Sequence, residues 1–481
     1  MAVHDTILVL DFGSPYTELI ARKIRENRVY SKILNFDASP KEILKIESVR
    51  GVILSEAPQI IDEKKLILPK KGILKLKVPV LGINYGALII AHLLKGKVKF
   101  ARKRQAVKTE VFIDDFSDIF YKLPANFTSE IYLEEGILKV PPHFKSTAHT
   151  LDLNSVSLSD RKNKIYGLKL HPKIFEDPKG DRILLNFLLR VCNCKRLWSE
   201  EIFIKEKIQE IKKIVGKKKV IVGLDGRLNS AVCAGIISKS IGRNLKCLFI
   251  DSEFSYDSRE DQVKLVRKVF KRDLHLNLTY IDKRRHFLNR LKGVISSEDK
   301  KRIIEEEYNF TFENEAKKIK NLEFLGLPTL YLEKKMKLPL LLKRRLKVIE
   351  PLKELFSNEI KRIAQKLRFP EFFIQMREIS PYQIPLRIKG EVTKENLKIL
   401  QEAEIRISDE IERSNLTDIK EIFAALIPLA DENILIIHCL SSSEGRPLEW
   451  SKLPYEILEK ISKKIKAEVK KIDHIVYSIA P

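Results

Sequence analysis

Cysteine is scarce in this chain. The 481 residues include five cysteines, at positions 192, 194, 233, 247 and 439. An odd and scattered set does not build a disulfide framework and fits a reducing compartment. Cys192 and Cys194 form a C-x-C pair that has no second pair with which to hold a metal. We therefore interpret the cysteines as buried thiols and expect no metal site.

Long hydrophobic runs are also missing. No apolar run reaches the roughly 18 residues that cross a bilayer. The N-terminus, MAVHDTILVL, passes directly into an apolar strand pattern, so we expect no signal peptide. There is no internal repeat and no low-complexity tract. The sequence predicts a cytoplasmic protein without a membrane partner.

Negative charge is in short supply. Lysine and arginine total 90 against 65 aspartates and glutamates, a net charge of +25. Basic runs occur at 99–104, 217–219, 283–285 and 343–345. Such a field attracts nucleotides or nucleic acid; the alternative is a set of solvated, lysine-rich helix faces. Aromatic residues do not alternate with the basic ones, so no stacking platform is indicated.

The order of strand and helix patterns indicates the fold class. Residues 1–197 alternate strands with amphipathic helices, which predicts a parallel sheet with helices on both faces. A charged helix leads into a second α/β unit over 198–352, whose loop at Asp225 lies at the carboxyl end of its first strand. From 353 to 481 the pattern becomes irregular and predicts a small α+β domain. The expected fold is two doubly wound α/β domains followed by this third domain.

One segment has the layout of a nucleophile elbow. In VPVLGINYGALIIAHLL, residues 78–94, a buried strand meets a tight turn and then a helix. Many hydrolases hold a nucleophile on such a turn. The residue at the turn here is Asn84, and an amide is not a nucleophile.

Several segments resemble the glutamine-hydrolysing GMP synthetases, in the same order and over nearly the whole chain. They include ILVLDFGSPYTELIARKIRENRVYSKI, GVILSEAP, the elbow segment, KKVIVGLDGRLNSAVCAGIISKSIGRNLKCLFIDS and IDHIVYSI. The resemblance implies a flavodoxin-like class I glutamine amidotransferase domain over 1–197. It implies an ATP pyrophosphatase domain of the adenine-nucleotide α-hydrolase type over 198–352. Over 353–481 it implies a dimerisation domain, hence a homodimer. The family reaction is a ligase reaction of purine biosynthesis, which makes GMP from XMP, ATP and glutamine.

The glutaminase motifs of that family are altered at three places. The elbow motif G-x-C-Y-G has Asn84 in place of cysteine, and the base motif His-Pro-Glu has Lys173 after His171 and Pro172. The oxyanion loop S-G-G-P has Glu56 and Ala57 in place of its glycines. A lysine beside His171 disfavours an imidazolium, and a glutamate opposes a developing oxyanion. We predict that glutamine hydrolysis is lost and that His171 is a packed, hydrogen-bonded histidine.

The family's pyrophosphate loop, S-G-G-x-D-S-S, is altered too. This chain has Asp225, Gly226, Arg227, Leu228, Asn229, Ser230 and Ala231 there. Arg227 can pair with a phosphate or with Asp225, and the second interpretation is favoured because it neutralises both charges. We therefore expect ATP and magnesium to be cofactors only if this degenerate loop still binds them. Asp251 and Ser252 resemble the adenosine-side strand end of the family.

The substrate side departs from the family as well. The chain is shortened between residues 326 and 348 and has KLPLLLKRRLK where the family has a histidine-rich lid. The XMP loop F-P-G-P-G-L is replaced by residues 380–385, SPYQIP. The sequence stops at 478–481 before the family's closing tail K-P-P-A-T-I-E-W-E.

These changes predict a non-catalytic, GMP synthetase-like protein that binds a nucleotide or a partner protein. One alternative is a ligase that uses free ammonia or an altered nucleotide. Another is a basic scaffold associated with nucleic acid.

Overall fold

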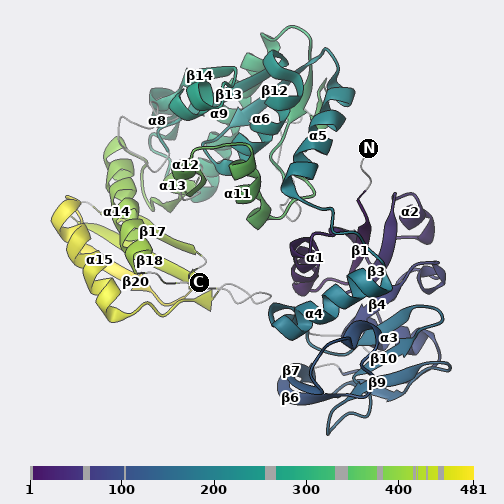
Figure 1. Cartoon of the computed structure of the whole chain (residues 1–481). Helices are drawn as coiled ribbons and strands as arrows, with labels where there is room; N and C mark the ends of the chain where they lie inside the picture. The colour runs from purple at the N-terminus through teal and green to yellow at the C-terminus, as the bar shows by residue number, and fades with distance from the viewer. Residues whose placement is uncertain are drawn as a thin grey trace. The chain divides into compact units, whose positions relative to one another are not determined.

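The computed structural model describes residues 4–57, 66–101, 104–254, 267–330, 345–375, 383–414, 416, 419, 421–429, 432–441 and 449–480. Contacts divide the chain into two compact units, and the main boundary along the sequence falls between Ser199 and Glu200. The predicted division into three domains, with boundaries after residues 197 and 352, stays a prediction. Each unit is described separately below (Figure 1).

The first unit is built on a nine-stranded sheet in the order β2-β1-β3-β4-β11-β10-β9-β6-β7. Strands β2, β1, β3, β4 and β11 are parallel, and β10, β9, β6 and β7 continue the sheet in antiparallel pairing. Their bounds are β1 Thr6–Asp11, β2 Tyr30–Asn35, β3 Val49–Leu54, β4 Val80–Ile83, β6 Ala106–Ile113, β7 Asn126–Tyr132, β9 Lys145–His149, β10 Ser157–Asp160 and β11 Ile165–Leu168. The sheet is therefore mixed, because the polar, strand-rich stretch after α3 extends it.

The helices of this unit cover the parallel strands. They are α1 Tyr16–Glu26, α2 Pro40–Leu44, α3 Tyr85–Leu93 and α4 Pro178–Asn186, and a small sheet of β5 Lys97–Lys99 and β8 Gly136–Lys139 lies apart. Leu8 and Leu10 of β1 are fully buried with Leu88 of α3 in one hydrophobic cluster. Burial on both faces explains why the parallel strands are nearly continuous apolar runs.

The second unit begins with a parallel sheet in the order β14-β13-β12-β15-β16. Its strands are β12 Lys219–Leu224, β13 Leu245–Asp251, β14 Leu278–Asp282, β15 Leu322–Gly326 and β16 Lys347–Ile349. The helices around it are α5 Glu200–Val215, α6 Leu228–Ile241, α8 Arg284–Leu291, α9 Ser297–Lys317, α11 Ser357–Lys366 and α12 Glu371–Gln375. This is the α/β arrangement that the sequence predicts.

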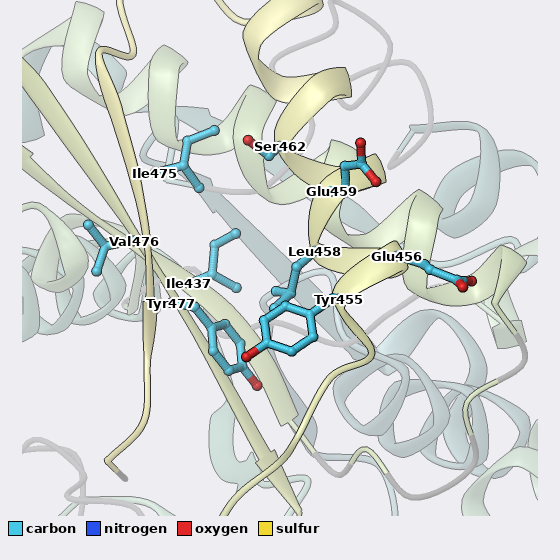
Figure 2. A pocket seen from close by; sticks show the side chains of 9 residues that line it. All are labelled: Ile437, Tyr455, Glu456, Leu458, Glu459, Ser462, Ile475, Val476 and Tyr477. Atoms are coloured by element: carbon cyan, nitrogen blue, oxygen red, sulfur yellow. The ribbon is translucent and has the colours of Figure 1, made fainter.

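A smaller α+β part completes the second unit. Strand β18 pairs with β17 and β19 in antiparallel fashion and with β20 in parallel. The elements are α13 Gln383–Arg387, α14 Lys394–Arg413, β17 Glu421–Pro428, β18 Asn433–Ser441, β19 Glu449–Trp450, α15 Tyr455–Glu468 and β20 His474–Ser478. Figure 2 shows α15 and β20 facing each other across a groove.

One hydrophobic cluster joins the two parts of the second unit. It contains Phe254 and Phe287 from the α/β part with Leu397 and Leu426 from the α+β part. All five cysteines are buried and free, which confirms the interpretation as buried thiols. Among the described residues, no helix is both long enough and apolar enough to cross a membrane.

Candidate functional site

The elbow at Asn84 is present in the first unit. Strand β4 ends at Ile83, Asn84 has φ 44° and ψ −99°, and α3 begins at Tyr85. A β-carbon added at Gly82 would lie 2.4 Å from the carbonyl carbon of Gly86, and one added at Gly86 would lie 2.3 Å from the carbonyl oxygen of Leu54. Both glycines are therefore required by the close approach of strand, turn and helix.

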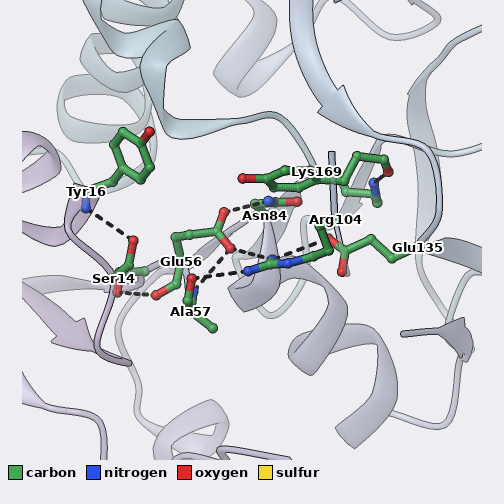
Figure 3. A network of polar contacts seen from close by, with 10 residues as sticks. Ser14, Tyr16, Glu56, Ala57, Asn84, Arg104, Glu135 and Lys169 are labelled. Carbon is green, nitrogen blue, oxygen red and sulfur yellow. Dashed lines mark hydrogen bonds and ion pairs between the residues drawn. The ribbon is translucent and has the colours of Figure 1, made fainter. Parts of the chain in front are cut away.

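The Asn84 side chain is held by Glu56, which follows β3 (Figure 3). Asn84 Nδ2 donates to Glu56 Oε2 at 2.5 Å, and the Ala57 N–H donates to Glu56 Oε1 at 3.1 Å. Arg104 Nη1 donates to the same Oε1 at 2.8 Å. Asn84, Glu56 and Arg104 are all buried. The structure thus brings the predicted elbow residue and the predicted oxyanion-loop residue into direct contact.

Two further charged side chains belong to this buried network. Glu135 Oε1 lies 3.6 Å from Arg104 Nη1, and Lys169 Nζ donates to the carbonyl oxygen of Tyr132 at 2.6 Å. Burial raises the pKa of Glu135 to about 7 and lowers the pKa of Lys169 to about 8. With Glu56 and Arg104, the network holds two potential anions and two potential cations. Within the described residues, neither carboxylate oxygen of Glu135 has a hydrogen-bond partner.

Sequence reasoning missed Arg104, Glu135 and Lys169. Arg104 ends a basic run that we interpreted by its charge alone, as a surface feature. The available signal was Lys169, which stands between two buried leucines immediately before His171. A lysine on an apolar strand end needs a buried partner. The partner's identity could not be predicted, because it comes from a distant strand.

His171 is packed as a neutral side chain. Its ring lies 4.7 Å from the ring of Tyr16 and 5.5 Å from that of Tyr132, both edge to face. Its Nδ1 accepts the Lys173 N–H at 3.3 Å. Burial lowers the pKa of His171 to about 4, and the charges of Lys173 and Arg104 act in the same direction. Among the described contacts, no hydrogen bond joins His171 to Asn84.

The second candidate site is the loop between β12 and α6. Gly226 has φ 84°, a left-handed conformation that favours glycine. Arg227 precedes α6, whose first residues include the buried Leu228, Ser230 and Ala231 together with Asn229. The loop therefore keeps the strand–turn–helix backbone that places N–H groups at a helix N-terminus.

The side chains of this loop bind one another. Arg227 Nε donates to Asp225 Oδ2 at 2.6 Å, and the Arg227 N–H donates to Asp225 Oδ1 at 3.1 Å. Ser230 Oγ donates to the same Oδ1 at 2.6 Å. The Asp225 carboxylate thus accepts from three donors of this loop, and the predicted Arg227–Asp225 contact is present. As arranged, the loop does not fit a polyphosphate.

The neighbouring strand end is also internally paired. Asp251 accepts a hydrogen bond from Tyr280 Oη and lies 3.7 Å from Arg284 Nε. Ser252 Oγ lies 2.5 Å from Tyr308 Oη. The shortened lid segment from residue 331 to 344 and residues 380–382 of the XMP loop lie outside the described residues. The described residues include no cluster of three histidine, cysteine or acidic side chains suited to a metal.

Comparison with known proteins gives consistent matches. The family model for class-I glutamine amidotransferases matches residues 8–191, and that for the GMP synthase C-terminal domain matches residues 409–481. A glutamine-hydrolysing GMP synthase of Gloeothece citriformis is 31% identical over 98% of this chain and 93% of its own length. One of Clostridium botulinum is 34% identical over 99% and 97%, and one of Clostridium perfringens is 33% identical over 99% and 98%.

Among solved structures, a glutamine amidotransferase of Thermotoga maritima aligns with a TM-score of 0.31 and 16% identity, over 40% of this chain and 99% of its own. The identification comes from the full-length relatives, which match the chain from end to end at above 30% identity. The chain belongs to the family of the glutamine-hydrolysing GMP synthases.

Proposed function

We propose that this family member does not hydrolyse glutamine and acts by binding a nucleotide or a protein partner instead of by catalysis. The observation that carries the proposal is the contact between the Asn84 amide and the Glu56 carboxylate, 2.5 Å apart on the elbow. The resemblance to the family requires a cysteine thiolate at this position, and an amide nitrogen whose lone pair is delocalised cannot replace it.

The surroundings of Asn84 support the same conclusion. The Glu56 carboxylate lies beside the elbow, where an oxyanion would need donors and not another negative charge. A histidine whose pKa is about 4 is a weak proton acceptor at neutral pH. Arg104 balances Glu56 from the opposite side, so the glutamate is held in place by an ion pair.

The test is release of glutamate from glutamine, in the presence and absence of ATP and XMP. We expect no release above the blank for the natural chain, with the Clostridium perfringens relative as a positive control. The triple variant Asn84→Cys, Lys173→Glu, Glu56→Gly restores three of the four altered residues, leaving Ala57, and should release glutamate at a measurable rate. In that variant the Arg104 guanidinium loses Glu56 but still has Glu135 at 3.6 Å, so its buried charge keeps an anionic neighbour. Glutamate release by the natural chain would refute the proposal.

The synthetase half is proposed to be inactive because the loop after β12 is paired internally. Calorimetric titration with ATP and with XMP, together with an assay of GMP formation from either glutamine or ammonium, tests this half. We expect no GMP under either condition. The variant Asp225→Ser, Arg227→Gly removes both members of the ion pair and should bind ATP more tightly than the natural chain. Equal affinity would indicate that the pair does not close the loop.

A second candidate is a ligase that uses free ammonia or an altered nucleotide. The observation in its favour is the retained backbone of the loop, with Gly226 at φ 84° and helix α6 directly behind it. Formation of GMP with ammonium but not with glutamine would select this candidate. Association with nucleic acid stays a prediction from the net charge of +25. A gel shift that weakens between about 50 and 200 mM salt would support it.

The proposed oligomer is a homodimer formed through the C-terminal sheet. Leu435, Ile437 and Cys439 of β18 face the helices and are buried. Ile434 and Ile436 point to the opposite face, because successive strand residues alternate. They pair across the sheet with apolar residues of β17, and Ile436 also pairs with Val476 of β20. This apolar face supports a dimer. The predicted cytoplasmic location stays a prediction.

A further inference from the structure

The C-terminal sheet ends in an open edge at β20. This strand pairs in parallel with β18 from Ile434↔His474 to His438↔Ser478. Of the strands that the structure describes, only β18 pairs with it. The outer edge of β20 therefore presents every second backbone N–H and C=O to whatever lies beside it.

A groove of about 450 Å³ runs along this edge, between β20 and α15 (Figure 2). Its apolar lining includes Leu458 of α15 with Ile475 and Tyr477 of β20. Val476 lines it as well. Because consecutive strand residues point to opposite faces, a groove that touches all three β20 residues must include the edge of the strand.

The first turn of α15 makes the rim of the groove acidic and aromatic. Tyr455 is 89% exposed, and Glu456 and Glu459 line the groove with it. Glu459 also pairs with Lys463 on the next turn of the helix, at 2.6 Å. A local acidic rim on a chain of net charge +25 is complementary to a cationic side chain.

We propose that this groove binds an extended peptide segment of a partner protein, in which apolar side chains alternate with lysine or arginine. The segment would add to the sheet as a strand beside β20. Its apolar side chains would lie on Ile475, Tyr477 and Leu458, and a cationic side chain would meet Glu456 or Glu459. Main-chain hydrogen bonds provide affinity in this mode of recognition, and the side-chain pockets provide specificity.

A second copy of this chain is a poorer occupant of the groove. A two-fold pairing of β20 with itself places the same surface on both sides of the contact. Each acidic rim would then need a cationic group from the partner's groove, whose lining residues include none. The apolar sheet face proposed above for dimerisation shares Val476 with the groove but not Tyr455, Glu456 or Glu459, so variants of these three residues test the groove separately.

The test is fluorescence anisotropy of the full chain with a labelled hexapeptide of alternating leucine and lysine. A peptide of alternating leucine and glutamate is the comparison. Non-specific attraction to a chain of net charge +25 would favour the glutamate peptide. We expect the lysine peptide to bind at least tenfold more tightly, which only a local acidic site explains.

Backbone methylation tests the strand pairing. Only every second amide of an added strand faces β20, so N-methylation of one alternating set should abolish binding and methylation of the other set should be tolerated. If both methylated peptides bound as well as the parent peptide, the strand-addition proposal would be wrong.

Variants of the rim locate the site. The double change Glu456→Lys, Glu459→Lys should weaken binding of the lysine peptide at least tenfold. Glu412→Lys, a single charge reversal on an exposed position of α14, is the control for a change away from the groove and should have no effect. If the double variant lost its circular dichroism signal, the variant Tyr455→Ala would decide, because Tyr455 is 89% exposed and can be truncated without disturbing the core. This variant should bind the lysine peptide several-fold more weakly than the natural chain. A preference for the glutamate peptide would overturn the proposal, and so would unchanged binding of the lysine peptide to the rim variants. The proposal would also be wrong if the rim variants lost a dimer and kept peptide binding.

Discussion

At the residue scale, Asn84 occupies a backbone conformation that side chains avoid. Its φ of 44° with ψ of −99° is retained although no reactive atom remains on the turn. The hydrogen bond to Glu56 and the surrounding glycines hold it there. The cost of that conformation can be separated from the loss of the hydrogen bond by comparing alanine with glycine.

We predict that Asn84→Gly is more stable than Asn84→Ala. Both variants lose the bond to Glu56, but only alanine keeps a β-carbon in the left-handed region, at about 1–2 kcal/mol. At Ala91, within α3, the order should reverse, because glycine in a helix costs about 1 kcal/mol. Urea unfolding followed by Trp198 fluorescence in a Trp450→Phe background reports on the first unit, since the chain has two tryptophans. Equal stabilities at position 84 would mean that the turn relaxes in the variants.

Glu135 should make the stability of the first unit depend on pH. Its pKa is raised from 4.5 to about 7, so the folded state binds the extra proton and stability falls as pH rises from about 4.5 to 7. His171 acts oppositely: its pKa is lowered from 6.5 to about 4, so stability rises between about pH 4 and 6.5. In the natural chain these two slopes oppose each other over the shared window, and the raised pKa of the buried Glu56 acts in the same direction as that of Glu135.

In the variant Glu135→Gln, the free energy of unfolding should show the pH dependence that His171 contributes. Relative to the natural chain, its free energy of unfolding should rise by about 2–3 kcal/mol between pH 4.5 and 7, at about 1.4 kcal/mol for each pKa unit. Loss of the anion near Lys169 lowers the pKa of that lysine further, which acts in the same direction. The same tryptophan-based unfolding at several pH values measures it. Parallel pH curves for the two proteins would show that Glu135 does not titrate in this range.

At the scale of elements, the elbow depends on how closely α3 approaches β3. Gly86→Ala would place a β-carbon 2.3 Å from the Leu54 carbonyl oxygen, a backbone atom that cannot turn aside. We predict that the free energy of unfolding falls by at least the upper end of the range typical of overpacked cores, which is about 1–3 kcal/mol. The control is Gly136→Ala, where the nearest atom is the flexible end of Leu153 at 3.2 Å. Thermal unfolding of the two variants should differ by several degrees, and similar midpoints would contradict the packing argument.

The sequence predicted the elements better than their connections. The strand that the sequence predicts immediately before Asp225 is found as β12 Lys219–Leu224, because its apolar pattern is local. That β6, β7, β9 and β10 extend the first sheet depends on pairing between distant segments, which no local pattern encodes. For the same reason the altered residues Asn84 and Glu56 were found from motifs, whereas the contact between them and the ion pair of Glu56 with Arg104 were not.

At the scale of the whole molecule, the net charge of +25 opposes association of identical chains. Dimerisation through the apolar face of the C-terminal sheet must therefore overcome a repulsion that salt screens. The Debye length falls from about 10 Å at 0.1 M to about 3 Å at 1 M. We predict that the dimer tightens as salt is raised, which is the opposite of the salt dependence expected for binding to nucleic acid.

Sedimentation velocity at increasing salt, with the natural chain and Ile436→Lys, tests this prediction. Ile436 lies on the apolar face beside Ala425 and Val476. A lysine there buries an unpaired charge in the contact, so it should raise the dissociation constant of the dimer at least tenfold. Leu151→Lys adds the same charge at a residue of the first unit that is 87% exposed, and should change the association no more than one extra charge requires. If Ile436→Lys and Leu151→Lys weakened association equally, repulsion between whole chains and not the sheet face would account for the loss, and the dimer would have to form elsewhere.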